Sequence, residues 1–162
     1  MKSPALLLAF ALISSSLAKA EEWDLYTNMR FGFSLAFPGN STGTHPPDER
    51  SGRKFVSASK KFVLEVEGGL LGSGNLEKFW KNSVAHYGEF ITYKVLKKDW
   101  FVVSGVRHGE EFYNKVSVRD GNWASFQITY PHAENKLYDP YVAKIAKSFQ
   151  PFLKGNFERA KK

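Results

Sequence analysis

The chain contains no cysteine, and this absence removes several classes of site at once. It excludes disulfides, thiol nucleophiles, thiolate metal sites and a lipid anchor on an N-terminal cysteine of a processed chain. Stability must therefore come from a packed core. Apolar and aromatic residues make up 43% and 15% of the 162 residues, which is enough material to build one.

Long apolar runs are also scarce, and the clearest one lies at the start of the chain. Lys2 precedes an apolar run at residues 6–13, and residues 18–20 form a small-residue cleavage site. This order is typical of a secretory signal peptide over residues 1–20, with an uncleaved membrane anchor as the alternative. We expect a mature chain from about Glu21, without a transmembrane segment, in the periplasm or secreted. The lack of cysteine favours a bacterial envelope over a disulfide-rich eukaryotic secreted protein.

Acidic residues are in deficit relative to basic ones. The chain has 23 Lys and Arg against 16 Asp and Glu, and removing Lys2 and Lys19 leaves 21 against 16, a net charge of +5. Such an excess favours anionic partners in general, whether lipid head groups, acidic glycans, nucleic acid or an acidic protein. The signs mostly alternate along the chain, as on an ordinary solvated surface. We expect another protein or an anionic envelope component as the partner, rather than nucleic acid.

Residues 21–153 are predicted to form one domain, followed by a charged tail at residues 154–162. Apolar residues at helical spacing predict helices at residues 76–87, after an N-cap at Asn75, and at residues 136–149. Alternating apolar residues predict strands at residues 30–37, 54–59 and 62–67, and four more strands within residues 91–131.

Two segments between these elements are predicted to be loops. Residues 40–52 are polar and lack periodicity, and residues 68–74 form a flexible glycine-rich connector. Residues 21–30 are expected to be a short lead-in. The sequence therefore predicts an α+β fold, with an antiparallel sheet of about six to seven strands flanked by helices.

The four strands within residues 91–131 can be assigned faces once their turns are chosen. We predict a three-residue loop at residues 119–121, a two-residue turn at residues 108–109 and a three-residue turn at residues 97–99. These turns place most apolar side chains on one face: Ile91, Tyr93, Val95, Phe101, Val103, Gly105, Phe112, Val116, Val118, Ala124, Phe126, Ile128 and Tyr130. The two helices are expected to cover that face.

The opposite face then mixes aromatic and basic side chains, and it is the best candidate for a binding site. Its members are Trp100, Tyr113, Lys115, Arg119 and Trp123. The aromatic rings could stack on a ligand or partner while the cations supply positive charge. The alternative is that the lead-in, a helix or the long loop covers these aromatics, because soluble monomers seldom expose large apolar patches.

No catalytic, metal or cofactor site is predicted. The nearest metal-like patterns, His108 with Glu110 and His132 with Glu134, are short spacings beside expected turns. The glycine-rich residues 68–74 precede a helix, whose N-terminus could hold an anion, but they match no phosphate-binding motif. A strand-to-helix connector is the simpler interpretation.

Several segments resemble the PsbP-like group of small exported domains. They are FGFSLAFPG at residues 31–39, GRKFVS at 52–57, LEVEG at 64–68, ITYKVLKKDWFVVSG at 91–105, FYNK at 112–115, and YP, YDP and SF at 130, 138 and 148. The resemblance covers nearly all of the mature chain and implies a PsbP-like α/β/α sandwich with an antiparallel sheet. Relatives with this fold include a photosystem II extrinsic subunit and a Ran-binding import factor, mostly non-enzymatic adaptors. No site residue can be carried over by motif.

Three functions remain open on these grounds. The first is a non-catalytic interaction module that binds a protein or an envelope component. The second is a small-molecule or anion-binding protein that uses the loops at residues 40–52 and 68–74. A hydrolase is the weakest hypothesis, because general acid–base work needs carboxylates that converge on one cleft.

Overall fold

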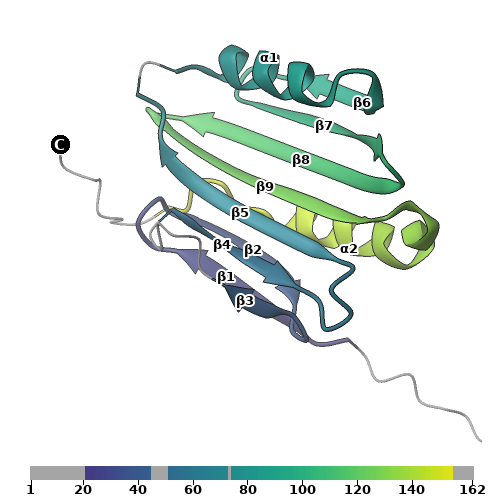
Figure 1. Ribbon diagram of the computed structural model, residues 1–162. Helices are drawn as coiled ribbons and strands as arrows, with labels where there is room; N and C mark the ends of the chain where they lie inside the picture. The colour runs from purple at the N-terminus through teal and green to yellow at the C-terminus, as the bar shows by residue number, and fades with distance from the viewer. Residues whose placement is uncertain (1–20, 45–50, 73, 155–162) are drawn as a thin grey trace, which may run out of the picture.

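The computed structural model describes residues 21–44, 51–72 and 74–154. The predicted signal peptide lies outside these residues, as does nearly all of the predicted tail. Within them, strands β1 to β5 precede helix α1, and strands β6 to β9 lie between α1 and helix α2 (Figure 1). The strands are β1 Trp23–Asn28, β2 Phe33–Pro38, β3 Thr42–Thr44, β4 Gly52–Val56, β5 Val63–Leu70, β6 Ile91–Leu96, β7 Trp100–Arg107, β8 Glu110–Arg119 and β9 Asn122–Pro131. The helices are α1 Leu76–Tyr87 and α2 Asn135–Ser148, with short 3-10 turns at Gly88–Phe90 and His132–Glu134.

Seven of these strands form one antiparallel sheet in the order β3-β4-β5-β9-β8-β7-β6. Strands β6 to β9 follow one another through tight turns, and β9 then pairs with β5, which joins the β6–β9 strands to the β3–β5 strands in the middle of the sheet. The β1–β2 hairpin forms a separate two-stranded sheet. The α+β prediction and the predicted strand number are confirmed.

Local sequence signals predict the helices well, and they predict the irregular segments less well. Helix α1 has the predicted bounds, because the Asn75 side chain accepts a hydrogen bond from the Lys78 N–H at 2.9 Å and Gly88 ends the helix with φ 52°. The expected lead-in instead contains β1, and the expected loop at residues 40–52 contains β3. Backbone pairing to a neighbouring strand organises segments that carry little periodicity of their own.

The glycine-rich connector is also shorter than predicted, because its first part belongs to β5. The Gly68 N–H donates to the Ser51 carbonyl at 2.8 Å. A Cβ at Gly68 would lie 2.5 Å from the Phe33 ring, so glycine here provides close packing of the sheet on β2. The first two glycines of the stretch, Gly68 and Gly69, therefore lie in a strand and not in a flexible loop.

The predicted three-residue loop at residues 119–121 is wrong. Arg119 pairs directly with Asn122, which leaves a two-residue turn of Asp120 and Gly121 with φ 51° and 76°. Asp-Gly is a strong signal for such a turn. The one-residue difference moves every side chain of β8 to the other face relative to β9. The side chains of Phe112, Val116 and Val118 therefore lie on one face of the sheet, and those of Ala124, Phe126, Ile128 and Tyr130 lie on the other.

The three-residue turn at residues 97–99 is wrong for the same reason. Leu96 pairs with Phe101, and the Lys97 N–H donates to the Trp100 carbonyl at 2.8 Å, so Lys98 and Asp99 alone make the turn. Tyr93 and Val95 consequently lie on the face opposite Phe101 and Val103. Ile91 keeps its predicted face only because the register shifts between Ile91 and Tyr93. The two-residue turn at residues 108–109 is confirmed.

Each half of the sheet has its own core, on opposite faces. We call the two faces the α1 face and the α2 face. On the α1 face, α1 packs over β6, β7 and β8, and the buried residues there are Leu76, Tyr87, Phe101, Val103, Phe112 and Val116. On the α2 face, α2 and the β1–β2 hairpin cover β4, β5 and β9, and the buried residues there are Phe33, Leu35, Phe55, Phe62, Leu64, Val66, Ala124, Phe126, Ile128, Tyr130, Tyr138, Ile145 and Phe149. Helical elements thus lie on both sides of the sheet, as the expected sandwich requires (Figure 1).

Candidate functional site

The five predicted binding residues do not share one face. Trp100, Tyr113, Lys115 and Arg119 lie on the α2 face, at the positions that β7 and β8 present there. Trp123 lies on the α1 face, where its ring centroid is 5.4 Å from that of Phe79 on α1. Trp123 is therefore a packing residue under the helix, and the corrected turn at Asp120 explains the separation.

Lys115 lies at the centre of the remaining group. Its Nζ is 5.2 Å from the centroid of the Trp100 ring and 5.9 Å from that of the Phe149 ring. Burial lowers the pKa of the Lys115 ammonium below its ordinary value. A cation held among aromatic rings and away from water can contact a partner at a lower desolvation cost than a fully hydrated lysine.

Residues 149–153, just after α2, cover part of this group. The Arg119 guanidinium lies 4.6 Å from the Phe152 ring centroid and donates to the Phe152 carbonyl at 2.8 Å. Backbone bonds between Ser34 and Gln150 fix the segment to β2. Arg119 therefore serves to hold this segment, which leaves less of it for a partner.

Tyr113 is half-buried beneath the same surface. Its ring stacks on Phe126 with centroids 5.7 Å apart. Burial, and after it the neighbouring Tyr93, raises the pKa of the Tyr113 hydroxyl. The ring thus joins the large core to the surface above β8.

Tyr93 extends the surface across the edge of the sheet. It lies beside Ser104 and Tyr113 on adjacent strands and is 56% exposed. The three-residue turn predicted at residues 97–99 places Tyr93 on the core face, whereas the two-residue turn observed places it on the α2 face. We call Tyr93, Trp100, Tyr113 and Lys115 the open aromatic strip.

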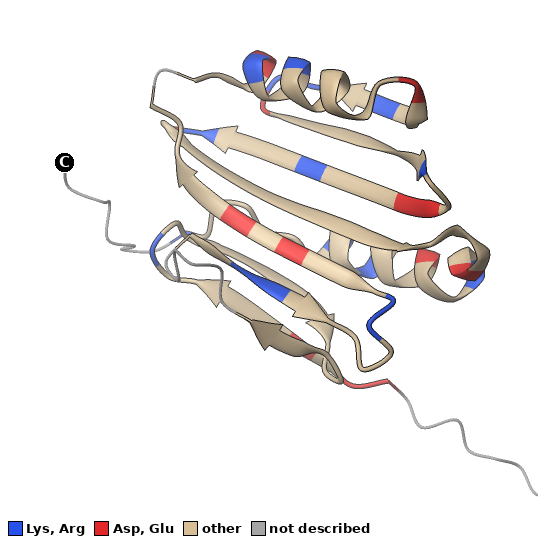
Figure 2. Ribbon diagram, viewed as in Figure 1, with Lys and Arg blue, Asp and Glu red and all other residues tan. Residues whose placement is uncertain are grey.

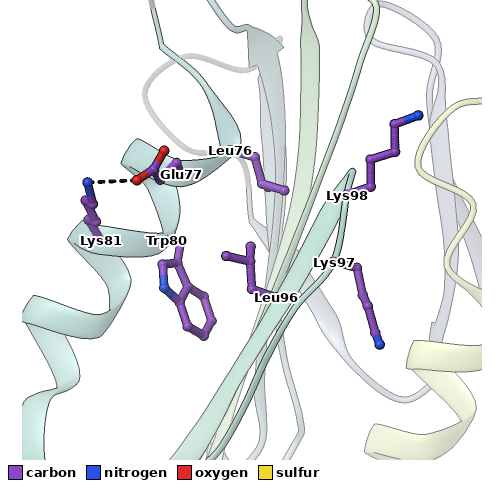
Figure 3. A pocket seen from close by; sticks show the side chains of 7 residues that line it. All are labelled: Leu76, Glu77, Trp80, Lys81, Leu96, Lys97 and Lys98. Atoms are coloured by element: carbon purple, nitrogen blue, oxygen red, sulfur yellow. Dashed lines mark ion pairs between the residues drawn. The ribbon is translucent and has the colours of Figure 1, made fainter.

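Two shallow pockets lie on the other side of the sheet. One, of about 320 Å³, lies at the end of α1 among His86, Tyr87, Arg107, Gln127 and Thr129. The Tyr87 hydroxyl donates to Gln127 there at 2.9 Å. The second, of about 360 Å³, lies between the start of α1 and the β6–β7 turn and is drawn in Figure 3.

The structure shows where the residues weighed for metal and anion binding lie. His132 Nδ1 pairs with Glu111 Oε1 at 2.7 Å, and His108 has a positive φ in the β7–β8 turn. Across residues 21–44, 51–72 and 74–154, no three His, Asp or Glu side chains are grouped as metal ligands. The Asn75 side chain already accepts a hydrogen bond from the first turn of α1. The anion-binding alternative stays a prediction, with Gly68–Leu70 removed from its loop.

Together, the sheet order and the two-sided helices define an α+β protein with a PsbP-like fold, as the sequence resemblance implied. The chain is similar to cyanobacterial PsbP (CyanoP) from Synechocystis sp. PCC 6803, with a TM-score of 0.60 and 13% identity over 86% of this chain and 98% of that one. It is also similar to the Saccharomyces cerevisiae Ran-binding protein Mog1p, with a TM-score of 0.51 and 10% identity over 83% and 97%. No protein-family profile and no curated protein sequence matches the chain. Likeness at such low identity establishes the fold alone.

Neither α-helix in the described part of the chain is long and apolar enough to cross a membrane.

Proposed function

We propose that the protein is a non-catalytic interaction module, exported to the periplasm or cell exterior, that binds a partner protein through the open aromatic strip. One observation carries the proposal: this half of the α2 face presents aromatic and aliphatic side chains without a helix packed over them. Tyr93 is 56% exposed, and Val95 and Trp100 beside it are half-buried. Exposed apolar groups of this kind, gathered in one place, are typical of interaction surfaces.

The other uncovered half of the sheet provides the contrast. On the α1 face, strands β5 and β9 carry polar side chains, namely Glu65, Glu67, Ser125, Gln127 and Thr129. Figure 2 shows the two acidic positions as red bands on β5. The polar side chains of that surface can be hydrated, so the surface needs no cover. The difference between the two uncovered halves supports a role for the strip that an open sheet face alone would not.

The composition of the strip suits a protein partner. Tyrosine and tryptophan are enriched among residues that contribute most to binding free energy, because they bury large areas at low conformational cost. Lys115 adds a cation in a desolvated setting, where a partner carboxylate would be attracted strongly. The likeness to Mog1p, which is named as Ran-binding, adds support that this sheet-and-helix fold can present a protein-binding surface.

Site-specific photo-crosslinking tests the proposal. A benzophenone amino acid is placed at Tyr93 and, as a matched control, at Glu67, which is exposed on the polar uncovered half. We expect Tyr93 to crosslink one defined partner in extract of the source cells, and Glu67 to crosslink none at comparable yield. The partner is then purified and titrated against wild type and Tyr93→Ala/Trp100→Ala.

Truncating two central aromatics should weaken binding by about thirtyfold or more, since each such residue contributes about 1–2 kcal/mol at an interface centre. Circular dichroism and urea unfolding of the variant establish that it is folded. Equal crosslinking at Tyr93 and Glu67, or unchanged affinity of the folded double variant, would mean that the strip is not the binding site.

A further inference from the structure

A second surface, separate from the open aromatic strip, lies where the start of α1 meets the β6–β7 turn. We call it the α1–hairpin corner and define it by Trp80 and Lys81 of α1 and Leu96, Lys97 and Lys98 of the hairpin. These residues line the pocket of about 360 Å³ together with Leu76 and Glu77. In Figure 3 the apolar side chains Leu76, Trp80 and Leu96 point toward one another at its centre.

The apolar centre is open to solvent. Leu96, at the end of β6, is 42% exposed, although Phe101, its pairing partner on β7, is completely buried. The Trp80 ring is half-buried and packs edge-on against Phe101, with centroids 5.5 Å apart. An exposed leucine beside a partly exposed tryptophan is the combination that favours the boundary between lipid head groups and acyl chains.

Lysines lie to either side of this centre. Lys81 extends from α1, whereas Lys97 and Lys98 extend from the turn on the other side of Leu96 and point away from the apolar side chains (Figure 3). Lys78 on α1 and Lys94 on β6 are exposed nearby. The acidic residues of the same two elements and turn are fewer, and Glu77 is paired with Lys81 at 2.8 Å.

Other acidic side chains lie away from the corner. Figure 2 shows red positions on β5 and at the start of β8, and blue positions on α1 and β6 but also on β4, β8 and α2. The β5 positions are Glu65 and Glu67, and the β8 positions are Glu110 and Glu111. At the corner itself the five lysines outnumber Glu77 and Asp99, so an anionic surface would attract it.

The kind of cation decides between a lipid surface and an acidic protein. All five cations around the corner are lysines, whose flexible ammonium groups act as point charges. A carboxylate held in fixed geometry by a protein partner is better matched by the planar arginine fork. Flexible lysines on either side of an apolar centre suit a laterally mobile array of phosphates over hydrocarbon.

We infer that the α1–hairpin corner docks the protein on an anionic lipid surface, with Leu96 and Trp80 entering the head-group boundary and the lysines contacting phosphates. The contact is peripheral and reversible. It leaves the open aromatic strip, on the other face of the sheet, free to hold a protein partner at the membrane.

Vesicle co-sedimentation tests the inference with the chain from residue 21, which contains every described element. The probe is vesicles of phosphatidylglycerol and phosphatidylcholine in equal parts, compared with pure phosphatidylcholine. We expect binding to the anionic vesicles alone, weakening as salt rises. Lys97→Gln/Lys98→Gln should weaken partitioning by about thirtyfold, because each lysine near such a surface contributes about fivefold. Leu96→Ser should weaken it by about fivefold.

Lys136→Gln/Lys147→Gln is the matched control, because it removes the same charge from exposed positions of α2. It should change partitioning by no more than about twofold. An equal loss in control and corner variants would overturn the inference in favour of net charge alone. Binding to polyglutamate resin without binding to the vesicles would overturn it in favour of an acidic protein, and no binding to either would overturn it outright.

Discussion

In the β4–β5–β9 half of the sheet, the covered face is the one on which α2 and the β1–β2 hairpin pack, whereas in the β6–β8 half it is the α1 face. Among the described residues, the core of the first half has thirteen buried residues and that of the second has six, so the two cores differ in depth as well as in side. Each half also leaves one face uncovered. That face is polar along β5 and β9, and aromatic along β6, β7 and β8.

This comparison separates two reasons for an uncovered sheet face. A polar face needs no cover, because its side chains bond to water and to each other, as Lys54 and Glu65 do at 2.7 Å. The aromatic face is covered in part by residues 149–153, while Tyr93 remains 56% exposed, and this exposed part is the reason we propose a partner there. The boundary between the two situations runs between β8 and β9, where the covered side of the sheet changes.

The largest effect that can test the comparison comes from the two cores. Phe126 and Phe101 are both completely buried, one in each cluster. We expect Phe126→Ala to cost about 4 kcal/mol of unfolding free energy and Phe101→Ala about 3 kcal/mol, measured by urea titration. Phe126→Ala should accelerate amide exchange in both helices, because it acts on the larger core. Phe101→Ala should accelerate exchange chiefly in α1.

Equal acceleration of α1 and α2 by both substitutions would show that the two cores unfold as one cooperative unit. In that case the difference in depth has no energetic meaning. Val103→Ala is a suitable second substitution in the smaller core, because it removes less volume at another completely buried position.

A glycine inserted after Gly121 tests what fixes the register at the boundary. It creates the three-residue loop that the sequence analysis expected. We predict that β8 and β9 keep their pairing at a cost of about 1 kcal/mol, because a register change would expose Phe112 or Phe126. An NMR measurement of cross-strand contacts between Lys115 and Phe126, which pair in the structure, would check this. Their replacement by contacts one residue away would show that the turn, and not the two cores, sets the register.

The sequence was a good guide where a local signal decides the structure and a poor one where the decision is global. Asn75 and Gly88 bounded α1 without help from the rest of the fold. The faces of β8 could not be settled in the same way. The turns predicted from the sequence gather most apolar residues on one face, whereas the sheet is covered on different faces in its two halves. Phe112 and Phe126 are both buried, but under different elements.

The prediction of the candidate site depended on the same strand register. Trp100, Tyr113 and Lys115 were found together because their grouping within β7 and β8 depends on the His108–Gly109 turn, which was predicted correctly. Trp123 was included and Tyr93 omitted because both depend on the turns that were wrong. The cover that residues 149–153 supply over Arg119 involves a segment distant in sequence and could not be anticipated from periodicity.

Alkaline unfolding compares a buried hydroxyl in each half. Tyr130 donates to Asp139 at 2.7 Å in the larger core, and Tyr87 donates to Gln127 at 2.9 Å beside the smaller one. Burial raises the pKa of both hydroxyls, and for Tyr130 the hydrogen bond to Asp139 raises it further. Above about pH 10 the unfolded chain loses tyrosine protons that the folded state retains, so stability falls as pH rises.

Tyr130→Phe and Tyr87→Phe should each cost about 1 kcal/mol at neutral pH, through the lost hydrogen bond. Each variant should then lose less stability than wild type between about pH 9 and pH 11, and the difference should be larger for Tyr130→Phe. Urea unfolding at a series of pH values measures both. Parallel pH profiles for wild type and Tyr130→Phe would contradict the assignment of the alkaline loss to this hydroxyl.

The smallest expected effect, and the one of opposite sign, concerns Lys115 on the open aromatic strip. Its lowered pKa means that burial disfavours the cation relative to the neutral amine. Lys115→Met keeps the length of the side chain and removes the charge, so it should stabilise the fold by up to about 1 kcal/mol. The same substitution should weaken partner binding, since it removes a cation that a partner can approach at low desolvation cost. Thermal unfolding and titration of the crosslinked partner measure the two effects on one variant.

Lys94→Met, which changes an exposed lysine on the α1 face of β6, is the control and should alter neither. A residue that lowers stability where it stands and raises affinity for a partner is expected only on a surface that acts in binding, so loss of stability in Lys115→Met would count against the strip as that surface.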